Sequence, residues 1–544
     1  MVEQIAADVL VAGGGMGGLM AATRAHLAGA RVVLLTGLPG ASVRMAGFAT
    51  ALLDDPRDRP EHLFNDMFIA GGFVNNPRVV AAMASRIGPE THYLQGLGVP
   101  FERREGRLAR RQAAGVTWPR AVYTTGMVGQ DAGRRLIDRL RQAGSPPVWV
   151  LDRGLLMDLD VRDGVVCGGL AYVRSTKQWA HVVAPAVVIA TGGVGRLFRR
   201  TTNFPSTNGM GYAMGLESGA PLVDMEFVSF EPTVAVAPEK IARMEVPTMA
   251  FSDGARLLNA DGDEFVATMP PVSKDVMSRA ILAEVRAGRG TPAGGVYYDL
   301  RRMPPDTALS YLQIRRVLQA LDASPAEARI EVCPTQHYLM GGIQADESAA
   351  TPVPGLFAVG EAAGGAHGAH RLATCGGTEV IAMGAIAGEA GAAHAAAAGA
   401  PGRPVERKPM PDLMEESMDA ADAARLEVLR GALEQGCGVL RDEAGLREAL
   451  GALTSLKEGL AAAGRMRTFL GRAVLVACSL AESALLRTES RGDHFRVDHP
   501  LRDDRSWLGN LVTTLGGDGA TIRTSFHPAG IAVRAAASLT ADSL

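Results

Sequence analysis

The residues near the start of the chain that are best spaced for chemistry are three glycines, Gly13, Gly15 and Gly18, in the pattern G-x-G-x-x-G. This spacing is typical of a turn that binds a dinucleotide. The first glycine permits the tight turn, the second lets the backbone approach a pyrophosphate, and the third lets helix and strand pack closely. The N-terminus of the following helix would present free N–H groups and a partial positive charge to the phosphates. The triplet therefore predicts a dinucleotide cofactor.

The segments around the glycines predict the elements that such a turn requires. DVLVA (8–12) is expected to be a buried strand, 19–28 a helix with small residues, and RVVLL (31–35) a second buried strand. Thr36 ends this second strand, where an acidic residue usually binds the ribose hydroxyls, so a weaker contact from its hydroxyl is expected. The alternative is a glycine-rich turn in some other α/β fold.

Composition and charge exclude several classes of protein. The chain has 544 residues, enough for two to four domains. Lys+Arg is 55 and Asp+Glu is 58, a net charge of -3, without the basic excess of a nucleic-acid-binding protein. The five cysteines form no CxxC pair, which argues against a disulfide framework, an iron–sulfur cluster or a cysteine zinc site. No metal is expected, and scattered thiols fit a reducing cytoplasm.

Neither a targeting segment nor a membrane span is expected. The N-terminus carries acidic residues and lacks the basic region of a signal peptide. We find no uncharged run of about 18 large apolar residues, the length that spans a bilayer. The nearest run, 380–400, is mostly Ala and Gly and is expected to be a tightly packed internal helix.

The pattern along the chain predicts an insertion within the nucleotide-binding unit. Further strands are expected at 182–190, before the turn TGG (191–193), and at 355–361. The stretch between them is richer in charge and proline and contains LLNADGDEF, a hairpin signal around Asp261-Gly262. After a proline-rich linker at 401–411, apolar residues at helical spacing predict a bundle. The predicted domains are a nucleotide-binding domain in two parts (1–235 and 346–405), a cap (236–345) and a helical C-terminal domain (410–544).

Motifs over most of the chain resemble the flavoprotein subunits of succinate dehydrogenase and fumarate reductase, with L-aspartate oxidase as the nearest soluble relative. The motifs that carry the resemblance follow the family's order: AGGGMGGLMAA (12–22), VIATGGVGRLF (188–198), SKDVMSRAI (273–281), PTQHYLMGGI (334–343), GLFAVGEAAGGAHGAHRL (355–372) and ESRGDHFRVDHPLRDDRSW (489–507). The resemblance implies an α/β fold: a Rossmann-like FAD-binding domain, an inserted α+β capping domain and a C-terminal helical domain. It also implies hydride transfer between flavin N5 and a carbon beside a carboxylate.

The resemblance carries a set of residues over to FAD. They are Gly13, Gly15 and Gly18 at the pyrophosphate, Thr191, Gly192 and Gly193 along the nucleotide, Glu361 at ribose or ribityl hydroxyls, and Ser42, Ala46 and Gly47 along the isoalloxazine. In membrane-bound members a histidine near the end of the second βα loop joins the flavin covalently, but this chain has no histidine between His26 and His62. FAD is therefore expected to be non-covalent and of low potential.

The substrate half of the family's site is only partly kept. His337 and Arg371 match the residues that bind a substrate carboxylate, and an arginine fork suits that planar group. Glu231 stands where the family has a second carboxylate-binding histidine, and Phe251 falls at or near the proton-relay arginine. Two carboxylates side by side strain each other, so plain succinate or fumarate is not expected as substrate.

Three hypotheses follow. In the first, an FAD-dependent oxidoreductase acts on a substrate with one carboxylate at Arg371 and His337, while Glu231 faces a donor group or serves as the base with a raised pKa. The second keeps the family activity, L-aspartate oxidase or soluble fumarate reductase. The third is a silent flavin-binding scaffold or sensor. Dioxygen or a soluble carrier is the expected electron acceptor, with no nucleic-acid partner.

Overall fold

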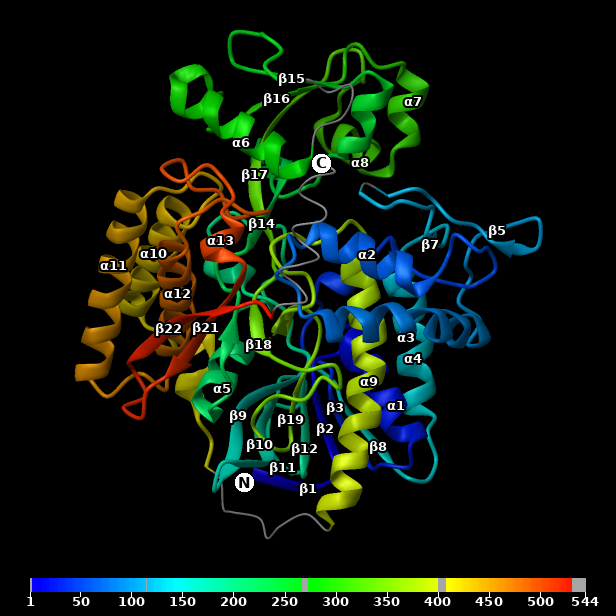
Figure 1. Cartoon of the computed structure of the whole chain (residues 1–544), viewed down its shortest axis with the longest axis vertical. Helices are drawn as coiled ribbons and strands as arrows, with labels where there is room; N and C mark the ends of the chain where they lie inside the picture. Colours follow the sequence, from blue (N-terminus) through cyan, green and yellow to red (C-terminus); the bar gives the residue numbers. More distant parts are fainter. Residues whose placement is uncertain (1, 114, 267–272, 400–407, 531–544) are drawn as a thin grey trace.

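A five-stranded parallel sheet, called the central sheet because layers cover both its faces, lies in the lower half of the molecule as drawn in Figure 1. The computed structural model describes residues 2–113, 115–266, 273–399 and 408–530. The strand order of the central sheet is β19-β12-β2-β3-β8, and every neighbouring pair is parallel. The strands are β2 (Val9–Ala12), β3 (Val32–Leu35), β8 (Val148–Leu151), β12 (Ala186–Ile189) and β19 (Leu356–Ala358). They confirm the predicted βαβ unit and α/β class.

The two faces of this sheet are covered by different layers. Val9 and Val11 of β2 pack with α1 (Met16–Leu27) and α9 (Cys375–Ala398) on one face, which the helices line in Figure 1. Leu10 of the same strand packs on the other face against a mixed sheet of order β1-β11-β10-β9, in which β1 is parallel to β11 and the other neighbours are antiparallel. That sheet comprises β1 (Val2–Ala6), β9 (Gly154–Arg162), β10 (Val165–Val173) and β11 (Gln178–Val183). Burial on both faces explains the unbroken apolar runs of the central strands.

Helix α9 is the Ala- and Gly-rich segment predicted to be internal. It packs so closely on α1 that a Cβ at Gly384 would overlap the backbone of Gly17. Helices α9 and α12 (Phe469–Leu486) are long and apolar enough to qualify as membrane spans by length and composition, although none was expected. The most apolar windows of α9 and α12 are 56% and 83% buried within the protein, so packing accounts for their composition. The neighbouring helices are α2 (Pro60–Ala70), α3 (Pro77–Gly96) and α4 (Val128–Arg141).

The cap is a second sheet of order β14-β17-β16-β15 with its own apolar core, at the top of Figure 1. Its elements are β14 (Val228–Ala237), β15 (Arg256–Leu258), α6 (Lys274–Glu284), β16 (Val296–Asp299), α7 (Pro305–Ser310), α8 (Leu312–Leu321) and β17 (Arg329–Leu339). An antiparallel bridge between Leu258 and Glu264 confirms the predicted hairpin. Most of β14 precedes the predicted boundary at 236, because the strand pairs along the whole length of β17.

The C-terminal region begins with helices α10 (Ala420–Gly436), α11 (Glu443–Ala462) and α12, as predicted. It also contains strands β21 (Gly509–Leu515) and β22 (Ile522–Pro528), which the helical prediction missed. These strands extend a sheet with β13 (Leu222–Val223), β18 (Gly342–Gln344) and β20 (Ala363–Gly364). The prediction failed because the hairpin is stabilised by pairing with strands distant in sequence.

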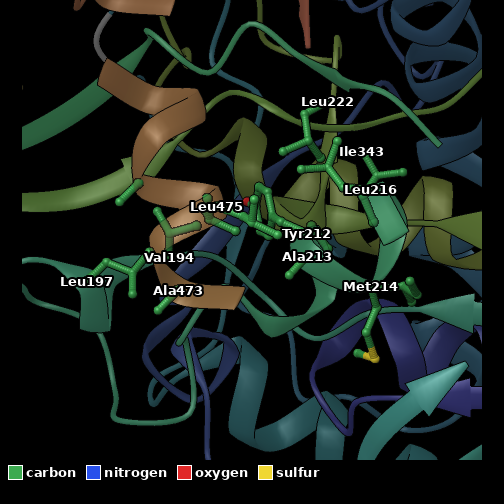
Figure 2. Packing of buried hydrophobic residues seen from close by; sticks show 14 of the residues in the cluster. Val194, Leu197, Tyr212, Ala213, Met214, Leu216, Leu222, Ile343, Ala473 and Leu475 are labelled. Carbon is green, nitrogen blue, oxygen red and sulfur yellow. The ribbon is translucent and has the colours of Figure 1, made fainter. Parts of the chain in front are cut away.

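One apolar core joins the C-terminal helices to the nucleotide-binding part. Figure 2 shows Tyr212 and Leu216 of α5 (Met210–Ser218) beside Leu475 of α12 and Ile343 of β18. The C-terminal helices therefore share one hydrophobic core with the nucleotide-binding part, which contains the predicted site. The remaining short elements are β4 (Gly47–Ala49), β5 (Arg103–Arg104), β6 (Arg107–Leu108), β7 (Ala121–Tyr123) and α13 (Asp504–Trp507).

Candidate active site

The glycine triplet forms the predicted strand–turn–helix between β2 and α1. Gly13 has a φ of +126°, and a Cβ there would overlap the Ala190 carbonyl at the end of β12. A Cβ at Gly18 would overlap the Gly13 carbonyl, so this glycine sets the close packing of helix on turn. The backbone thus requires glycine at both positions, for the reasons inferred from the sequence.

The N-terminus of α1 has free N–H groups that can bind an anion. Its N-cap is Gly15, which has no side chain to bind the first free N–H groups. The Ser42 hydroxyl accepts a hydrogen bond from the Met16 N–H at 3.0 Å, and Gly15 and Gly17 line an adjacent cavity. Unfilled N–H groups and the helix dipole at such a cradle suit a pyrophosphate.

A single cavity of about 470 Å³ connects this turn to the predicted substrate residues. Of the predicted site residues, those that line it are Gly13, Gly15, Thr36, Ser42, Gly47, Thr191, Gly192, Glu361, His337 and Arg371. Those outside its lining are Gly18, Ala46, Gly193 and Glu231. Gly18 and Gly193 pack behind the residues that line the cavity, and a Cβ at Gly193 would overlap the Glu361 carboxylate. Ala46 is exposed and is not brought to the cavity.

Three lining groups have polar atoms suited to a nucleotide cofactor. Glu361 accepts a hydrogen bond from the Leu339 N–H at 3.0 Å through Oε1, and burial raises the pKa of its carboxyl to about 8. The Thr191 hydroxyl is buried without a hydrogen-bond partner among the described residues. The Thr36 hydroxyl already accepts a bond from the Arg153 N–H at 2.8 Å, although its hydrogen can still be donated. Turn, helix end and these groups fit FAD.

His337 is held in one orientation by Thr202. The distance between His337 Nδ1 and the Thr202 hydroxyl is 2.8 Å, which leaves Nε2 as the nitrogen available to a substrate. The pKa of His337 is lowered to about 4: burial is the largest cause, Arg371 and Lys274 act in the same direction, and Glu231 opposes them. The ring is therefore neutral at pH 7. When Thr202 donates to Nδ1, Nε2 carries the hydrogen and donates to a carboxylate.

Arg371 lines the same cavity as His337, and together they form the predicted substrate subsite. No ion pair balances the charge of Arg371 among the described residues. Its guanidinium carbon stacks 4.5 Å from the centre of the Tyr338 ring, and its Nε is buried without a hydrogen-bond partner in the described ranges. Tyr338 is fixed in turn by a 2.7 Å hydrogen bond from its hydroxyl to Glu379. Within the described chain Arg371 forms no ion pair, so its fork is available to an anion.

The loop carrying Arg371 is held by the C-terminal region. His370 Nδ1 lies 3.0 Å from the Asp493 carboxylate, and the Asp493 N–H donates to the Ala369 carbonyl at 2.9 Å. Arg491 also bonds the Gly72 carbonyl at 2.8 Å. The segment around 489–504, part of a motif behind the family resemblance, thus serves to position the arginine.

The environment of Glu231 does not support the hypothesis that this residue is a base with a raised pKa. Burial raises the pKa of its carboxyl, but the cationic Lys274 and Arg371 outweigh burial, so the pKa is lowered. Lys274 Nζ lies 2.5 Å from Glu231 Oε2. Because the carboxylate is ionised and ion-paired near neutral pH, it is poorly suited to take a proton.

Phe251 does not lie in the substrate site, the place that its position at or near the family's proton-relay arginine had indicated. It is 1% exposed, packs in the cap core, and its ring lies 5.2 Å from that of Tyr298. It does not line the cavity. The cations that approach the site instead are Lys274 from α6 and Arg44, a cavity residue 3.9 Å from Glu245.

Sequence reasoning missed Lys274, Arg44 and Glu245 as site residues. Lys274 lies in SKDVMSRAI, one of the segments that carried the resemblance, but its position gave no sign of a contact with Glu231. Arg44 lies in the stretch considered for a flavin-linking histidine and for Ser42, Ala46 and Gly47 along the isoalloxazine, but not for a substrate-binding cation. Glu245 has no motif around it, so only the fold reveals it.

Comparisons with known proteins agree with this geometry. A family model for an FAD binding domain matches residues 8–376, and one for the C-terminal part of fumarate reductase flavoproteins matches 427–534. The chain is 31% identical over 579 residues to the fumarate reductase flavoprotein subunit of Mycobacterium tuberculosis, covering 96% of this chain and 97% of that protein. It is 32% identical over 544 residues to L-aspartate oxidase of Streptomyces coelicolor, covering 94% and 92%.

A solved structure of Mycobacterium smegmatis Sdh1 in complex with UQ1 aligns with a TM-score of 0.85 and 30% identity. The alignment covers 97% of this chain and 95% of that one, so it includes the cap and the C-terminal region. Together with the two-part family match, this likeness confirms the family and the FAD cofactor expected from the motifs. The chain therefore belongs to the succinate dehydrogenase and fumarate reductase flavoprotein family, and it is an FAD-dependent oxidoreductase.

Proposed function

We propose that the protein transfers hydride between flavin N5 and a small molecule bearing one carboxylate, and that plain succinate and fumarate are not its substrates. The observation that carries this is Arg371, which has no ion-pair partner among the described residues and whose Nε is buried without a hydrogen bond, beside neutral His337 in the cavity that also contains the glycine turn. A carboxylate is the group that both side chains bind well. FAD, when bound, supplies the hydride acceptor or donor.

The other side of the subsite disfavours a second carboxylate. Lys274 is already paired with Glu231, so a substrate carboxylate placed there would share one ammonium with Glu231. Two carboxylates in one partly buried site repel each other, and such juxtaposition costs several kcal/mol. An amine, a hydroxyl or an apolar group meets no such repulsion. The reaction is then α,β-dehydrogenation or its reverse, or oxidation at an amine or alcohol carbon.

The names of the relatives favour a second candidate, L-aspartate oxidase or soluble fumarate reductase. This alternative requires a dicarboxylate to bind despite Glu231, with Lys274 taking the role of the changed histidine. A silent flavin-binding scaffold is the third candidate. The intact Arg371 and His337 pair speaks against it, because a scaffold has no use for a half-buried arginine that has no ion-pair partner in the described part of the chain.

For reoxidation we propose dioxygen or a soluble carrier, in the cytoplasm. FAD is proposed to be non-covalent because His337 is the one histidine among the residues lining the cavity and its Nδ1 is bonded to Thr202. Acid or heat should then release FAD from the purified yellow protein. Flavin that stays with the denatured polypeptide would contradict this assignment.

The deciding experiment is anaerobic flavin reduction by a set of acids. We expect bleaching of the flavin by a monocarboxylate, such as an α-hydroxy, α-amino or saturated short-chain acid, and little bleaching by succinate or aspartate. The dithionite-reduced protein is tested in the same way with unsaturated and oxo acids, including fumarate. Preferred turnover of C4-dicarboxylates would establish the second candidate, and no reaction with any acid would establish the third.

A further inference from the structure

The guanidinium of Arg371 lies over an aromatic ring instead of against an acid. Its central carbon is 4.5 Å from the centre of the Tyr338 ring, and the described residues offer it no ion pair. A ring face attracts a cation through its π electrons and uses none of the N–H donors. A carboxylate in the same place would bind the arginine fork on both sides. This contact therefore leaves the fork free for a substrate.

The Tyr338 ring is itself fixed by two buried side chains. Its hydroxyl donates a 2.7 Å hydrogen bond to Glu379 Oε2, and His367 Nε2 lies 2.9 Å from the same oxygen. The His367 ring also packs edge-on against the Tyr338 ring, with 5.7 Å between the ring centres. Glu379 and His367 are 1% and 3% exposed, so water does not compete for these bonds. The position of the ring under Arg371 is thus determined from its hydroxyl and from its edge.

Helix α9 supplies both the acid and the space for the arginine. Gly376 and Glu379 are three residues apart on this helix, so they face the same side. Gly376 lines the cavity, and a Cβ there would lie 3.1 Å from Arg371 Nη1. The helix therefore places a carboxylate at the far end of Tyr338 and leaves room for the guanidinium beside the cavity.

The charges around Tyr338 keep its hydroxyl a donor. Burial raises the pKa of Tyr338, Glu379 raises it further, and Arg371 opposes them, so the pKa lies well above its ordinary value. A hydroxyl that donates to a carboxylate is polarised by it, and this polarisation passes into the ring. A more electron-rich ring attracts a cation more strongly. Glu379 can thus stabilise Arg371 without touching it.

Other carboxyls near Arg371 are less suited to this role. Glu231 is neutralised by its ion pair with Lys274. Burial raises the pKa of Glu361 to about 8 and also raises that of Glu245, which weakens their negative charge near neutral pH. Glu379 has neither a lysine nor an arginine as an ion-pair partner in the described part of the chain, and its bonds come from Tyr338 and His367.

We propose that Glu379 is a positioning residue for Arg371 and acts through the hydroxyl of Tyr338. His367 orients the Glu379 carboxylate, Glu379 polarises the Tyr338 ring, and the ring keeps the arginine fork in place for a substrate carboxylate. The inference rests on the proposed function and deepens it, because it explains how an arginine without an acid partner stays directed at the cavity. The expected contribution is to binding of the acid more than to the hydride step.

The first test compares Tyr338→Phe and Glu379→Gln by titrating the flavin spectrum of the FAD-bound protein with acetate and with uncharged acetamide. Both variants should raise the Kd of acetate about tenfold and leave that of acetamide unchanged. The matched controls are Tyr298→Phe, a buried cap tyrosine that donates to the Pro247 carbonyl, and Glu90→Gln, a buried acid on α3. Both controls should bind acetate as wild type does.

The second test asks whether Glu379 works through the tyrosine hydroxyl. Once that hydroxyl is absent, loss of the Glu379 charge should have little further effect, so the double variant should bind acetate within about twofold of Tyr338→Phe alone. With the acid that bleaches the flavin fastest, both single variants should raise KM about tenfold and keep kcat within about threefold of wild type. A general loss of structure would not divide the effect in this way.

A third measurement needs no substrate. The ultraviolet resonance Raman difference between wild type and Tyr338→Phe isolates the bands of Tyr338, which should show a hydroxyl that donates strongly. In Glu379→Gln these bands should move toward those of a weaker donor, because a neutral amide oxygen replaces the carboxylate. Bands that do not move in this variant would refute the polarisation of the ring.

The outcomes separate the inference from the proposed function. If wild type prefers acetate to acetamide but both variants bind acetate as wild type does, the inference is wrong and the proposed function stands. Additive effects in the double variant, or equal losses in the controls, also overturn it. If wild type neither prefers acetate nor reacts with any acid, proposed function and inference fail together. Should Glu379→Gln not retain FAD, the acetate titration and the KM of Tyr338→Phe decide alone.

Discussion

The two halves of the cavity are lined by different kinds of groups. In the cofactor half, the binding surface is backbone: the glycine turn, the end of α1 and the turn at Thr191 and Gly192. In the substrate half it is a set of side chains from β17, the loop before α9, the segment after β14 and the 3-10 turn at 41–44. The first half keeps the glycine pattern of the turn and departs from the usual pattern at Thr36 and at the missing flavin-linking histidine, whereas the second half changes the substrate-binding residues at Glu231 and Phe251.

This difference shows which part of the site can diverge. A backbone cradle is disrupted when Gly13 or Gly18 gains a side chain, because a Cβ at either position would overlap backbone atoms, so the turn tolerates little substitution there and continues to bind the same cofactor. A subsite made from side chains can replace a histidine by a Glu–Lys pair without disturbing the fold. Specificity is therefore expected to depend on the second half alone, and the following experiments test that separation.

The largest effect is expected from Arg371→Lys. Lysine retains the charge but loses the fork and the stacking on Tyr338, so kcat/KM should fall about 10²–10³-fold. The visible spectrum of bound FAD serves as the control and should stay unchanged, because the cofactor half is untouched. A variant with more than about half of the wild-type kcat/KM would show that Arg371 is structural.

The next largest effect is expected at the changed position. Glu231→Gln frees the Lys274 ammonium, and Glu231→His restores the family residue, so both should tighten binding of succinate, fumarate or aspartate by roughly tenfold. The dissociation constants follow from titrating the flavin spectrum with each acid. Glu239→Gln, at an exposed cap carboxylate, is the control. If neither variant binds a dicarboxylate more tightly than wild type, Glu231 does not set substrate choice.

A smaller effect is expected where the C-terminal region covers the cavity. Leu413–Glu416 line its wall, and Arg196 binds Glu415 at 3.0 Å while Arg174 binds Glu416. Glu415→Gln combined with Glu416→Gln should speed FAD release about tenfold, measured by the rise in flavin fluorescence on dilution. Glu443→Gln, in an exposed pair on α11, should release FAD at the wild-type rate. Unchanged release in the double variant would mean that the segment does not retain the cofactor.

The smallest effect concerns pH and the loop of Arg371. The nearby Asp493 carboxylate raises the pKa of His370, although burial opposes it. Stability from this pair is fully present below the ordinary histidine pKa of 6.5 and is lost as pH rises through the raised value. The Tm of wild type should therefore fall by about 1–3 °C from pH 6 to pH 8 relative to Asp493→Asn. Parallel Tm curves for the two proteins would contradict this.

Much of the fold and half of the site could be predicted from sequence because their signals are local. The G-x-G-x-x-G turn, the buried strands beside it and the order of motifs are properties of short segments. His337 and Arg371 were found because their motifs survive. The hairpin of β21 and β22 was missed because its partner strand, β13, lies far away in sequence.

What only the tertiary structure decided is the electrostatics of the substrate half. Lys274 is 43 residues from Glu231, and only the packing of α6 against β14 brings the ammonium to the carboxylate and lowers its pKa. Glu245 gains its place in the cavity wall in the same way, and the packing of the cap core turns Phe251 away from it. Residue types are encoded position by position, but the field at each group depends on charges within a few ångströms. Those neighbours exist only once the chain has folded.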